Sequence, residues 1–273
     1  MEKKSVKIIV ATHKEYEMPS DEIYLPLHVG AAGKTNADGT PLEIPYTRDD
    51  TGENISSRNY CFGTQTGLYW MWKNLDADYL GLVHYRRYFT AGKAKKDDML
   101  GSVLKDEQLQ PMLEKYRVFL PKKRRYYIES VYSHYAHTLD GSQLDLTRQV
   151  IAEKTPGYVD AFDTVMKRTS AYIFNMMIME KALMDDYCSW MFPILFEVAQ
   201  RVDQTGMTAF EKRFCGRISE RLLNVWLEQR LRDGTIQKSQ IKELPYTENV
   251  NWGNKIKGFL AAKLFHKKYG ASF

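Results

Sequence analysis

The stretch YLGLVHYRRYF, residues 79–89, is the part of the sequence from which the fold can be predicted most directly. Its first half, Tyr79–Val83, is an apolar run with the length of a strand buried on both faces. The run leads into a histidine, a tyrosine and two arginines. In open α/β sheets, ligands bind at the edge where parallel strands end. The stretch therefore indicates a buried strand that leads into a binding site.

Strand and helix patterns alternate along the rest of the chain. Apolar runs predict further strands at residues 6–11, 118–120 and 172–179, and residues 18–48 are expected to be loop-rich. Apolar residues spaced by three and four predict helices over residues 64–74, 145–153, 187–202 and 218–231. Ser219 is the expected N-cap of the last helix, and Pro193 is expected in a first turn or at a kink. This alternation favours an α/β fold with a mainly parallel sheet flanked by helices.

The domain organisation predicted from the sequence is one domain over residues 1–245 and a basic, apolar tail over residues 246–273. On a helical wheel the tail has an apolar stripe with lysines at its border. It fits a helix lying on an anionic membrane surface, and equally a helix packed on the domain. No run of 18 apolar residues predicts a transmembrane span.

Composition narrows the classes of function. The net charge of +5 suits an anionic small ligand, an anionic membrane surface, or neither, and no nucleic-acid-binding motif is present. Aromatic residues make up 13% of the chain, with 18 tyrosines, which suits carbohydrate recognition or an aromatic core. The three cysteines are far apart and predict neither a disulfide framework nor a zinc site, so a cytoplasmic protein is expected.

The cluster after the second strand offers phosphate-binding chemistry. On an extended chain, residues two apart project the same way, so His84 and Arg86 are expected to point together. A guanidinium donates two parallel hydrogen bonds to phosphate oxygens. His84, Tyr85, Arg86 and Arg87 are therefore candidates for a diphosphate site. The alternative is structural, with one arginine paired to a carboxylate and the other on the surface.

Seven segments in order also resemble a family of bacterial glycosyltransferases from capsular and exopolysaccharide gene clusters, long described as a domain of unknown function. They are IIVATHKEYEMP, IYLPLHVGAA, DDTGENISSRNY, TGLYWMWKN, YLGLVHYRRYF, IFNMMIMEKALMDDYCSWMFPILFE and ERLLNVWL, between residues 8 and 227. Of the Glu-Leu-Thr triplet typical of the family, this chain keeps only Thr66. The resemblance implies a GT-A-like fold and sugar transfer from a nucleotide-diphosphate sugar, with UDP expected.

The GT-A comparison also bears on metal use. Enzymes of that fold usually end the corresponding strand on Asp-x-Asp, which holds a divalent cation on the donor diphosphate. Here the same position reads His84-Tyr85-Arg86. We therefore expect fixed cations, Arg86, Arg87 and Lys14, to replace the metal and stabilise the leaving diphosphate. A site for Mn²⁺ or Mg²⁺ with His84 as a ligand is the alternative.

The same resemblance suggests roles for other residues. The end of the first strand, Thr12-His13-Lys14, would face the nucleotide, and Asn54 and Asn59 would hold the nucleoside, with turn or cap formation as the alternative for Asn54. Glu220, expected in the first turn of the last helix, is the candidate general base of an inverting transfer. A structural carboxylate favoured by the helix dipole is its alternative role.

Two residues are candidates for acceptor contact. Asn175 interrupts a predicted strand, and a ligand hydroxyl could satisfy its buried amide. Asp140 follows His134 and His137 in a segment that could be a mobile acceptor loop, although the two histidines could equally lie on the surface. Asp140 and Asp145 are also the reserve candidates for the general base.

The predicted function is a cytoplasmic or peripheral-membrane hexosyltransferase that acts on a lipid-linked or free saccharide in cell-surface glycan assembly. The alternative is a non-catalytic nucleotide-sugar- or carbohydrate-binding subunit.

Overall fold

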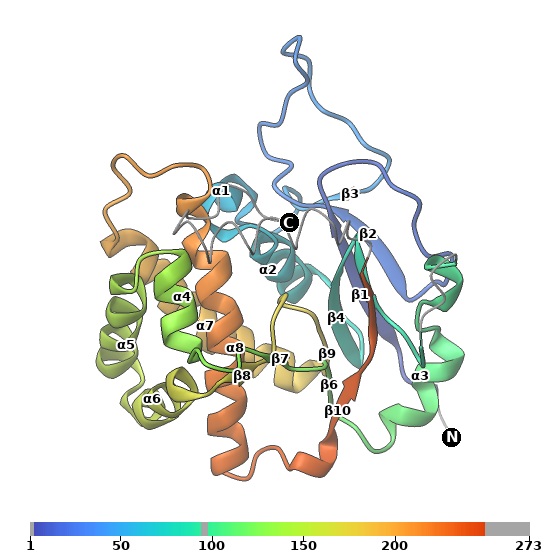
Figure 1. Cartoon of the computed structure of the whole chain (residues 1–273). Helices are drawn as coiled ribbons and strands as arrows, with labels where there is room; N and C mark the ends of the chain where they lie inside the picture. The colour runs from blue at the N-terminus through green and yellow to red at the C-terminus, as the bar shows by residue number, and fades with distance from the viewer. Residues whose placement is uncertain (1–2, 94–97, 249–273) are drawn as a thin grey trace.

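The computed structural model describes residues 3–93 and 98–248, which form one large sheet, one small sheet and helices on both sides of the large sheet (Figure 1). The strands of the large sheet are β1 Val6–Thr12, β2 Tyr24–His28, β3 Thr47–Arg48, β4 Tyr79–His84, β5 Arg87–Phe89, β6 Val118–Pro121, β9 Met177–Glu180, β10 Ile241–Leu244 and β11 Tyr246–Glu248. β7 Arg124–Arg125 and β8 Ser170–Ala171 form the small sheet.

The large sheet has the strand order β10–β6–β9–β4–β1–β2–β3, with β5 paired to the end of β4 and β11 paired to β5. Neighbours β4, β1, β2 and β3 are parallel, and so are β6 and β10. β9 runs antiparallel between β4 and β6. The predicted α/β architecture, a mostly parallel GT-A-like sheet flanked by helices, is confirmed.

The helices are α1 Asn59–Phe62, α2 Gln65–Asn74, α3 Asp106–Leu113, α4 Val131–Thr138, α5 Ser142–Lys154, α6 Val159–Lys167, α7 Lys181–Arg201 and α8 Phe214–Arg232. Alternate residues of β1 face opposite sides of the sheet. Ile9 belongs to the larger apolar cluster under α2, α7 and α8, whereas Ile8 and Val10 belong to the smaller one under α3. Figure 1 shows the same division, with α4 to α8 on one side and α3 on the other.

The predicted strand over residues 172–179 is correct only in its last part. β9 begins at Met177, because Phe174 and Asn175 adopt left-handed backbone angles, with φ of +73° and +55°. Residues 172–176 are therefore a loop that approaches the end of β4. Left-handed angles at two successive non-glycine residues are not visible in an apolar pattern.

Two helices begin earlier than predicted. α7 starts at Lys181, so Pro193 lies in its middle and not in its first turn. α8 starts at Phe214, so Ser219 is not its N-cap. Gly216 lets α8 approach α1 closely, since a Cβ atom there would lie 2.9 Å from the Phe62 carbonyl oxygen. Cys61 and Cys215 meet at this contact, buried and free.

The predicted tail begins at β11, where Tyr246–Glu248 adds a strand beside β5. The predicted membrane helix in the tail lies outside the described residues. Among the described helices, none combines the length and the hydrophobicity that crossing a bilayer requires.

Candidate active site

The end of β4 is a tight turn and not an extended segment. Tyr85 and Arg86 form the turn, and His84 pairs with Arg87 at the start of β5. The prediction that His84 and Arg86 point the same way is wrong, because the chain reverses direction between them. The residues that share a side of the sheet are the cross-strand partners His84 and Arg87.

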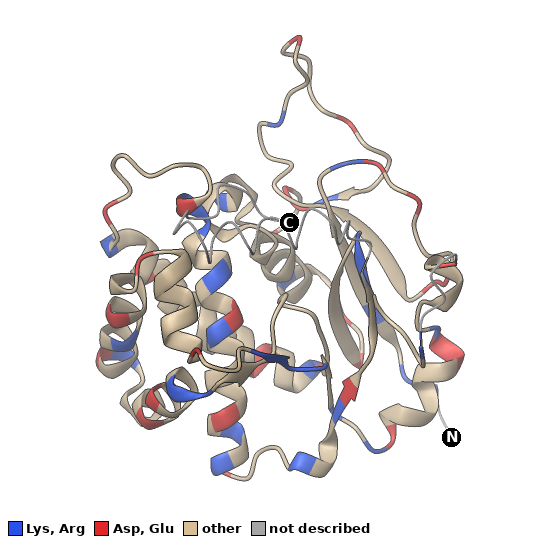
Figure 2. Cartoon of the chain, in the orientation of Figure 1, with Lys and Arg blue, Asp and Glu red and all other residues tan. Residues whose placement is uncertain are grey.

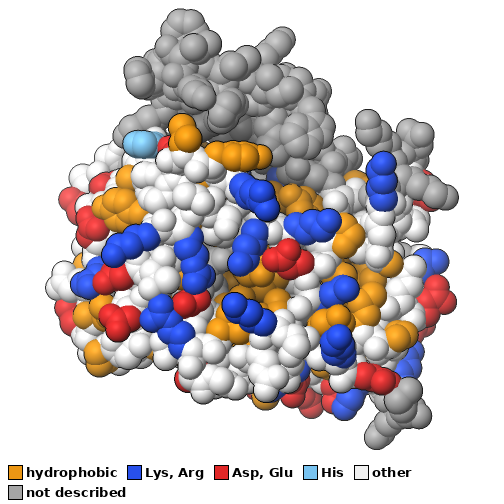
Figure 3. All heavy atoms as spheres, turned by 60° about the horizontal axis from the view of Figure 1, so that its bottom comes forward, with side chains coloured by type: hydrophobic (Ala, Val, Ile, Leu, Met, Phe, Trp, Pro, Cys, Tyr) orange, Lys and Arg blue, Asp and Glu red, His pale blue; other side chains and the backbone are white. Residues whose placement is uncertain are grey.

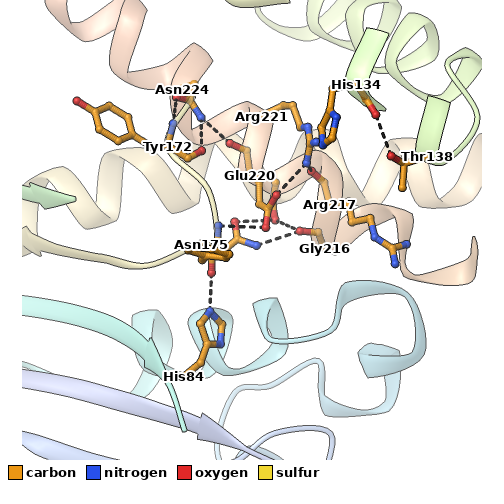
Figure 4. Close-up of polar contacts among 12 residues, drawn as sticks. His84, His134, Thr138, Tyr172, Asn175, Gly216, Arg217, Glu220, Arg221 and Asn224 are labelled. Carbon is orange, nitrogen blue, oxygen red and sulfur yellow. Dashed lines mark hydrogen bonds and ion pairs between the residues drawn. The ribbon is translucent and has the colours of Figure 1, made fainter. Parts of the chain in front are cut away.

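His84 and Arg87 both contact Phe174 in the loop before β9. The Nε2–H of His84 donates to the Phe174 carbonyl oxygen at 2.5 Å, and the Arg87 guanidinium carbon lies 4.2 Å from the centre of the Phe174 ring. Burial lowers the pKa of His84 to about 4, an effect that the nearby Arg87 charge reinforces. His84 is thus a neutral hydrogen-bond donor that holds the loop against the sheet edge (Figure 4).

Tyr85 and Arg86 form an aromatic and cationic platform with Tyr16. The Tyr16 and Tyr85 rings stack with their centroids 4.3 Å apart. The Arg86 guanidinium carbon lies 4.9 Å from the centre of the Tyr85 ring, and its Nη2 donates to the Tyr16 hydroxyl at 3.3 Å. Arg86 itself is exposed. Its guanidinium is therefore oriented by two tyrosines and still open to a ligand.

Four cations from four chain segments lie close enough to His13 for their charges to act on it. Desolvation lowers the pKa of His13, and the positive charges of Lys14, Arg213, Arg86 and Lys34 lower it further. They come from the loop after β1, the start of α8, the β4–β5 turn and the loop between β2 and β3. We call Lys14, Lys34, Arg86 and Arg213 the cation cluster. Such a convergence at the carboxyl edge of a sheet attracts an anion.

Thr12 stabilises the loop that carries His13 and Lys14. It is buried, and its hydroxyl donates to the Lys14 carbonyl oxygen at 2.7 Å, which closes the loop that carries His13 and Lys14. The side chain of Thr12 is thereby turned toward its own backbone. Its part in the site is to shape the loop.

The side chains at this edge do not fit a divalent cation. Within residues 3–93 and 98–248 there is no group of three or more His, Cys, Asp or Glu residues placed to hold a metal. The position of the GT-A carboxylates is occupied by the Tyr85–Arg86 turn. A guanidinium offers no lone pair to a metal, and Nε2 of His84 is already bonded to the Phe174 carbonyl oxygen.

Asp49, which sequence reasoning did not single out, holds the neighbouring loops together. It is fully buried and accepts four hydrogen bonds, from the Gly30 and Ala31 amides and the Ser56 and Thr66 hydroxyls. Thr66, the residue kept from the family triplet, thus has a structural partner. This network fixes the loop after β2 against the start of α2.

Asn54 and Asn59 belong to the same scaffold. Asn54 donates to the Gly52 carbonyl oxygen at 3.0 Å and accepts from the Ser56 amide at 3.2 Å, so it closes a turn. The side-chain amide of Asn59 donates to the Gly63 carbonyl oxygen at 2.8 Å. Each side-chain amide is thus bonded to the backbone of its own segment.

Glu220 lies in the second turn of α8, not the first as predicted, because the helix begins at Phe214. Its Oε1 accepts from the Phe174 amide at 3.1 Å, and its Oε2 pairs with Nη1 of Arg221 at 2.9 Å. About 23% of its side chain is exposed. Figure 4 shows the carboxylate between Arg221 and the loop that carries Asn175. The Glu220 carboxylate therefore contacts the loop through one oxygen and a largely buried arginine through the other, and it remains partly exposed to solvent.

Asn175 is held by α8. Its amide donates to the Gly216 carbonyl oxygen at 2.9 Å, and its Oδ1 accepts from the Ser219 hydroxyl at 3.1 Å. Asn224 likewise bonds both the amide and the carbonyl of Tyr172. The amide predicted to need a ligand is thus satisfied inside the protein, and the polar face of α8 shapes the loop.

The segment predicted to be a mobile acceptor loop is helical. Asp140 lies between α4 and α5, where its Oδ1 accepts from the Ser142 amide at 2.9 Å, and Asp145 accepts from the Tyr132 hydroxyl. His134 and His137 each bond one oxygen of Glu129, at 2.9 and 2.6 Å. His134 faces Arg221 in Figure 4 and borders the Glu220 side of the site.

Three members of the site, Tyr16, Lys34 and Arg213, were missed by sequence reasoning. Each is a single polar residue in a loop or at a helix start, with no local motif around it. Only the fold brings them to the end of β4. Arg221, the partner of Glu220, was also missed. Its spacing of four from Arg217 could have revealed it, since this spacing places the two arginines on one face of a helix.

Comparisons with known proteins match this geometry to one family. The model of DUF4422, a domain of unknown function, matches residues 7–231. A solved structure, the WbbM bifunctional glycosyltransferase in its apo form, is similar over 90% of this chain with a TM-score of 0.80 and 30% identity. This chain spans 46% of the length of that protein. A search of curated proteins found no match.

Proposed function

Since the chain belongs to the family described as DUF4422, a domain of unknown function, we propose that it is a glycosyltransferase that uses a nucleotide-diphosphate sugar. The observation that carries the proposal is the cation cluster at the carboxyl edge of the sheet. The likeness to the WbbM bifunctional glycosyltransferase supports the same reading. The donor is a hexose, pyranose or furanose, linked to UDP, and the acceptor is a lipid-linked or free saccharide in capsular, exopolysaccharide or other cell-surface glycan assembly.

The cation cluster would bind the donor diphosphate. Arg86 presents an exposed guanidinium, and Lys14 and Arg213 bring further positive charge to the same place. As the bond between the anomeric carbon and the diphosphate oxygen breaks, the bonding electrons leave with the nucleoside diphosphate. Fixed positive groups stabilise that growing charge and need no reorganisation during the reaction. The stacked rings of Tyr16 and Tyr85 offer a flat surface for the base or the sugar.

Glu220 is the group proposed to take the acceptor proton. In an inverting transfer the acceptor oxygen attacks the anomeric carbon from the face opposite the diphosphate, and its proton passes to a base. The ion pair with Arg221 orients the carboxylate beside the loop. The exposed part of the side chain gives the acceptor hydroxyl access to an oxygen.

A second candidate function is a non-catalytic subunit that binds a nucleotide sugar or a carbohydrate. The observation in its favour is that both oxygens of Glu220 already have protein partners, Phe174 and Arg221. In that case the carboxylate only shapes the binding site, and the protein would bind a donor without consuming it.

A thermal-shift screen of nucleotide-diphosphate sugars, with EDTA and with Mn²⁺, tests the proposal. A ligand that binds only the native state raises the melting temperature with its concentration. We expect UDP-hexoses to raise it in EDTA, followed by UDP release when a saccharide acceptor is added. Absence of any shift across the donor set in both conditions contradicts the proposal. A shift without UDP release for any acceptor favours the binding subunit.

A further inference from the structure

The segment KKRRYYI, residues 122–128, carries four consecutive basic residues followed by two tyrosines and an isoleucine. Its basic part includes strand β7, which Figure 2 shows in the colour of Lys and Arg. All four basic side chains are exposed, and none makes an ion pair with a residue in the described ranges. Some exposed arginines and lysines elsewhere in the fold do have a carboxylate partner, such as Arg148 with Asp163. This run has an unbalanced positive charge.

The tip of the same segment exposes large apolar side chains. Tyr127 is 82% exposed and Ile128 is 89% exposed, the two highest values among the large hydrophobic residues that the structure describes. These two adjacent side chains at the loop tip therefore have little of their surface buried within the chain. They are available for insertion into an apolar phase.

The backbone holds this tip in place. Tyr127 adopts a left-handed φ of +61°, which is rare for a residue with a large side chain. On one side Tyr126 is buried, its amide donates to the Thr169 carbonyl oxygen at 2.7 Å, and its ring lies 4.4 Å from the His134 ring. On the other side Ser130 caps α4. The Glu129 amide also donates to the Tyr126 carbonyl oxygen at 3.4 Å, so the anchored segment presents Tyr127 and Ile128 at the outward tip of a closed turn.

The surrounding surface is also basic. Figure 3 shows Lys and Arg side chains around an apolar hollow on one face of the molecule. A hollow of about 270 Å³ begins at Lys123 and is lined by Arg168, Lys238, Tyr172 and Leu231, with Glu228 and Glu243 inside it. Lys238 thus adds positive charge beside residues 122–125, whereas Arg168 is paired with Glu228.

We propose that residues 122–128 are a docking surface for an anionic lipid bilayer, with Tyr127 and Ile128 in the interfacial layer and the basic run on the headgroups. Aromatic and aliphatic side chains beside lysines and arginines are the combination that binds such an interface. Each basic residue near an anionic surface adds to the attraction, and salt weakens it. The inference concerns residues 122–128 alone and does not depend on the sugar-transfer proposal.

The first test uses a fluorescent label on the full chain. The three native cysteines are buried, so a thiol-reactive, environment-sensitive dye would label Ile128→Cys selectively. On vesicles of phosphatidylcholine with phosphatidylglycerol, we expect a blue shift of the dye emission and quenching by brominated acyl chains. Neither change is expected on pure phosphatidylcholine. The matched control is the dye on Glu107→Cys, an exposed site on α3, which should stay in water.

The second test measures vesicle binding of charge variants by co-sedimentation. Arg124→Gln combined with Arg125→Gln should weaken binding to the anionic vesicles by roughly thirty-fold. The control pair Lys4→Gln and Lys7→Gln, also exposed, should change it by less than about three-fold, because these residues lie away from the docking surface. Absence of binding to anionic vesicles overturns the proposal. So does a vesicle-bound protein whose Ile128→Cys label keeps its aqueous emission, since another part of the chain would then make the contact.

Discussion

The carboxylate of Glu220 accepts a hydrogen bond from the backbone amide of Phe174 at 3.1 Å, which ties α8 to the loop facing the end of β4. Through the same loop, Phe174 meets His84 and Arg87. The proposed base and the proposed donor site are therefore coupled by one loop of five residues, 172–176. Changes at Glu220 and His84 should have effects that can be separated by measuring turnover, donor affinity and stability.

Replacing Glu220 with glutamine should abolish turnover and preserve donor binding. Glutamine keeps an oxygen for the Phe174 amide but cannot take a proton, and a general base typically contributes 10²–10⁴-fold to the rate, so we expect a fall of at least about a hundred-fold. Donor affinity should change by less than about three-fold, because the cation cluster is untouched. Calorimetry and a UDP-release assay on the same preparation give both values.

Glu228→Gln is the matched control. Glu228 lies two turns further along α8 and is also paired with arginines, Arg168 and Arg232. Its replacement should leave turnover within about two-fold of the unmodified protein. Equal turnover of Glu220→Gln and Glu228→Gln would remove Glu220 from the mechanism.

His84 should make stability depend on pH. Its pKa is about 4 in the folded state, against 6.5 for a histidine exposed to water, so between these values the unfolded chain binds the proton and the folded protein does not. By linkage, stability from the neutral ring is present above pH 6.5 and is lost as the pH falls toward 4. The full shift corresponds to about 2 kcal/mol lost between pH 7 and pH 5, and the partial exposure of the ring reduces it, so we expect a loss of about 1–2 kcal/mol.

The comparison variant is His84→Gln, which retains a donor for the Phe174 carbonyl oxygen. His13, His28 and His134 also have pKa values lowered mainly by desolvation, so all of them contribute to acid sensitivity in the same direction. The free energy of unfolding in urea is measured for both proteins at pH 7 and pH 5. The difference between their two pH dependences is the contribution of His84. Identical pH dependence of the two proteins would show that the ring gains no proton on unfolding.

Asp49→Asn should destabilise the fold strongly. Both carboxylate oxygens accept two hydrogen bonds, and the asparagine would turn an NH₂ group toward two donors. Leaving buried donors unsatisfied costs about 1–3 kcal/mol each, so we expect a loss of about 2–4 kcal/mol. Asp76→Asn, at an exposed position, should change stability by less than about 0.5 kcal/mol in the same urea titration. Similar values for the two variants would contradict the role assigned to Asp49.

Gly30→Ala and Gly39→Ala separate backbone strain from steric contact. Both glycines have positive φ, +67° and +85°, but only at Gly30 would a Cβ atom clash, 2.3 Å from Cγ of Asn59. Gly39→Ala should cost about 1 kcal/mol from the backbone alone. Gly30→Ala should cost at least about 2 kcal/mol more, measured by thermal or urea unfolding. Equal losses would mean that the loop relaxes away from Asn59.

The centre of the sheet was predictable because β1, β4 and β6 are short apolar runs, interrupted only by Lys7 in β1. β1 and β4 are buried on both faces, and such runs show in the sequence as strands bounded by polar residues. The loop at 172–176 was not predictable in the same way, since its apolar residues hide the left-handed angles of Phe174 and Asn175. The prediction that Glu220 lies in the first turn of its helix failed because the first residues of α8 show no apolar periodicity that distinguishes them from a loop.

For the site, local sequence identified the residues of the β4 turn but not their arrangement. The turn at Tyr85–Arg86 replaces the extended geometry on which the expected orientation of His84 depended. Lys34 and Arg213 reach the site from distant segments, and no sequence pattern links them to His13. Their convergence is a property of the tertiary structure alone.

The central claim is that fixed cations at the sheet edge, and not a metal, hold the donor diphosphate. Its most direct measurement is a calorimetric titration of UDP in EDTA into the unmodified protein, Arg86→Ala, Arg213→Ala and, as a control, Arg148→Ala on the far side of α5. Because a charge-assisted hydrogen bond contributes about 1.5–3 kcal/mol, affinity should fall at least about ten-fold in the first two variants and stay unchanged in the control. UDP that binds only with Mn²⁺, or that binds Arg86→Ala as tightly as the unmodified protein, would contradict the account.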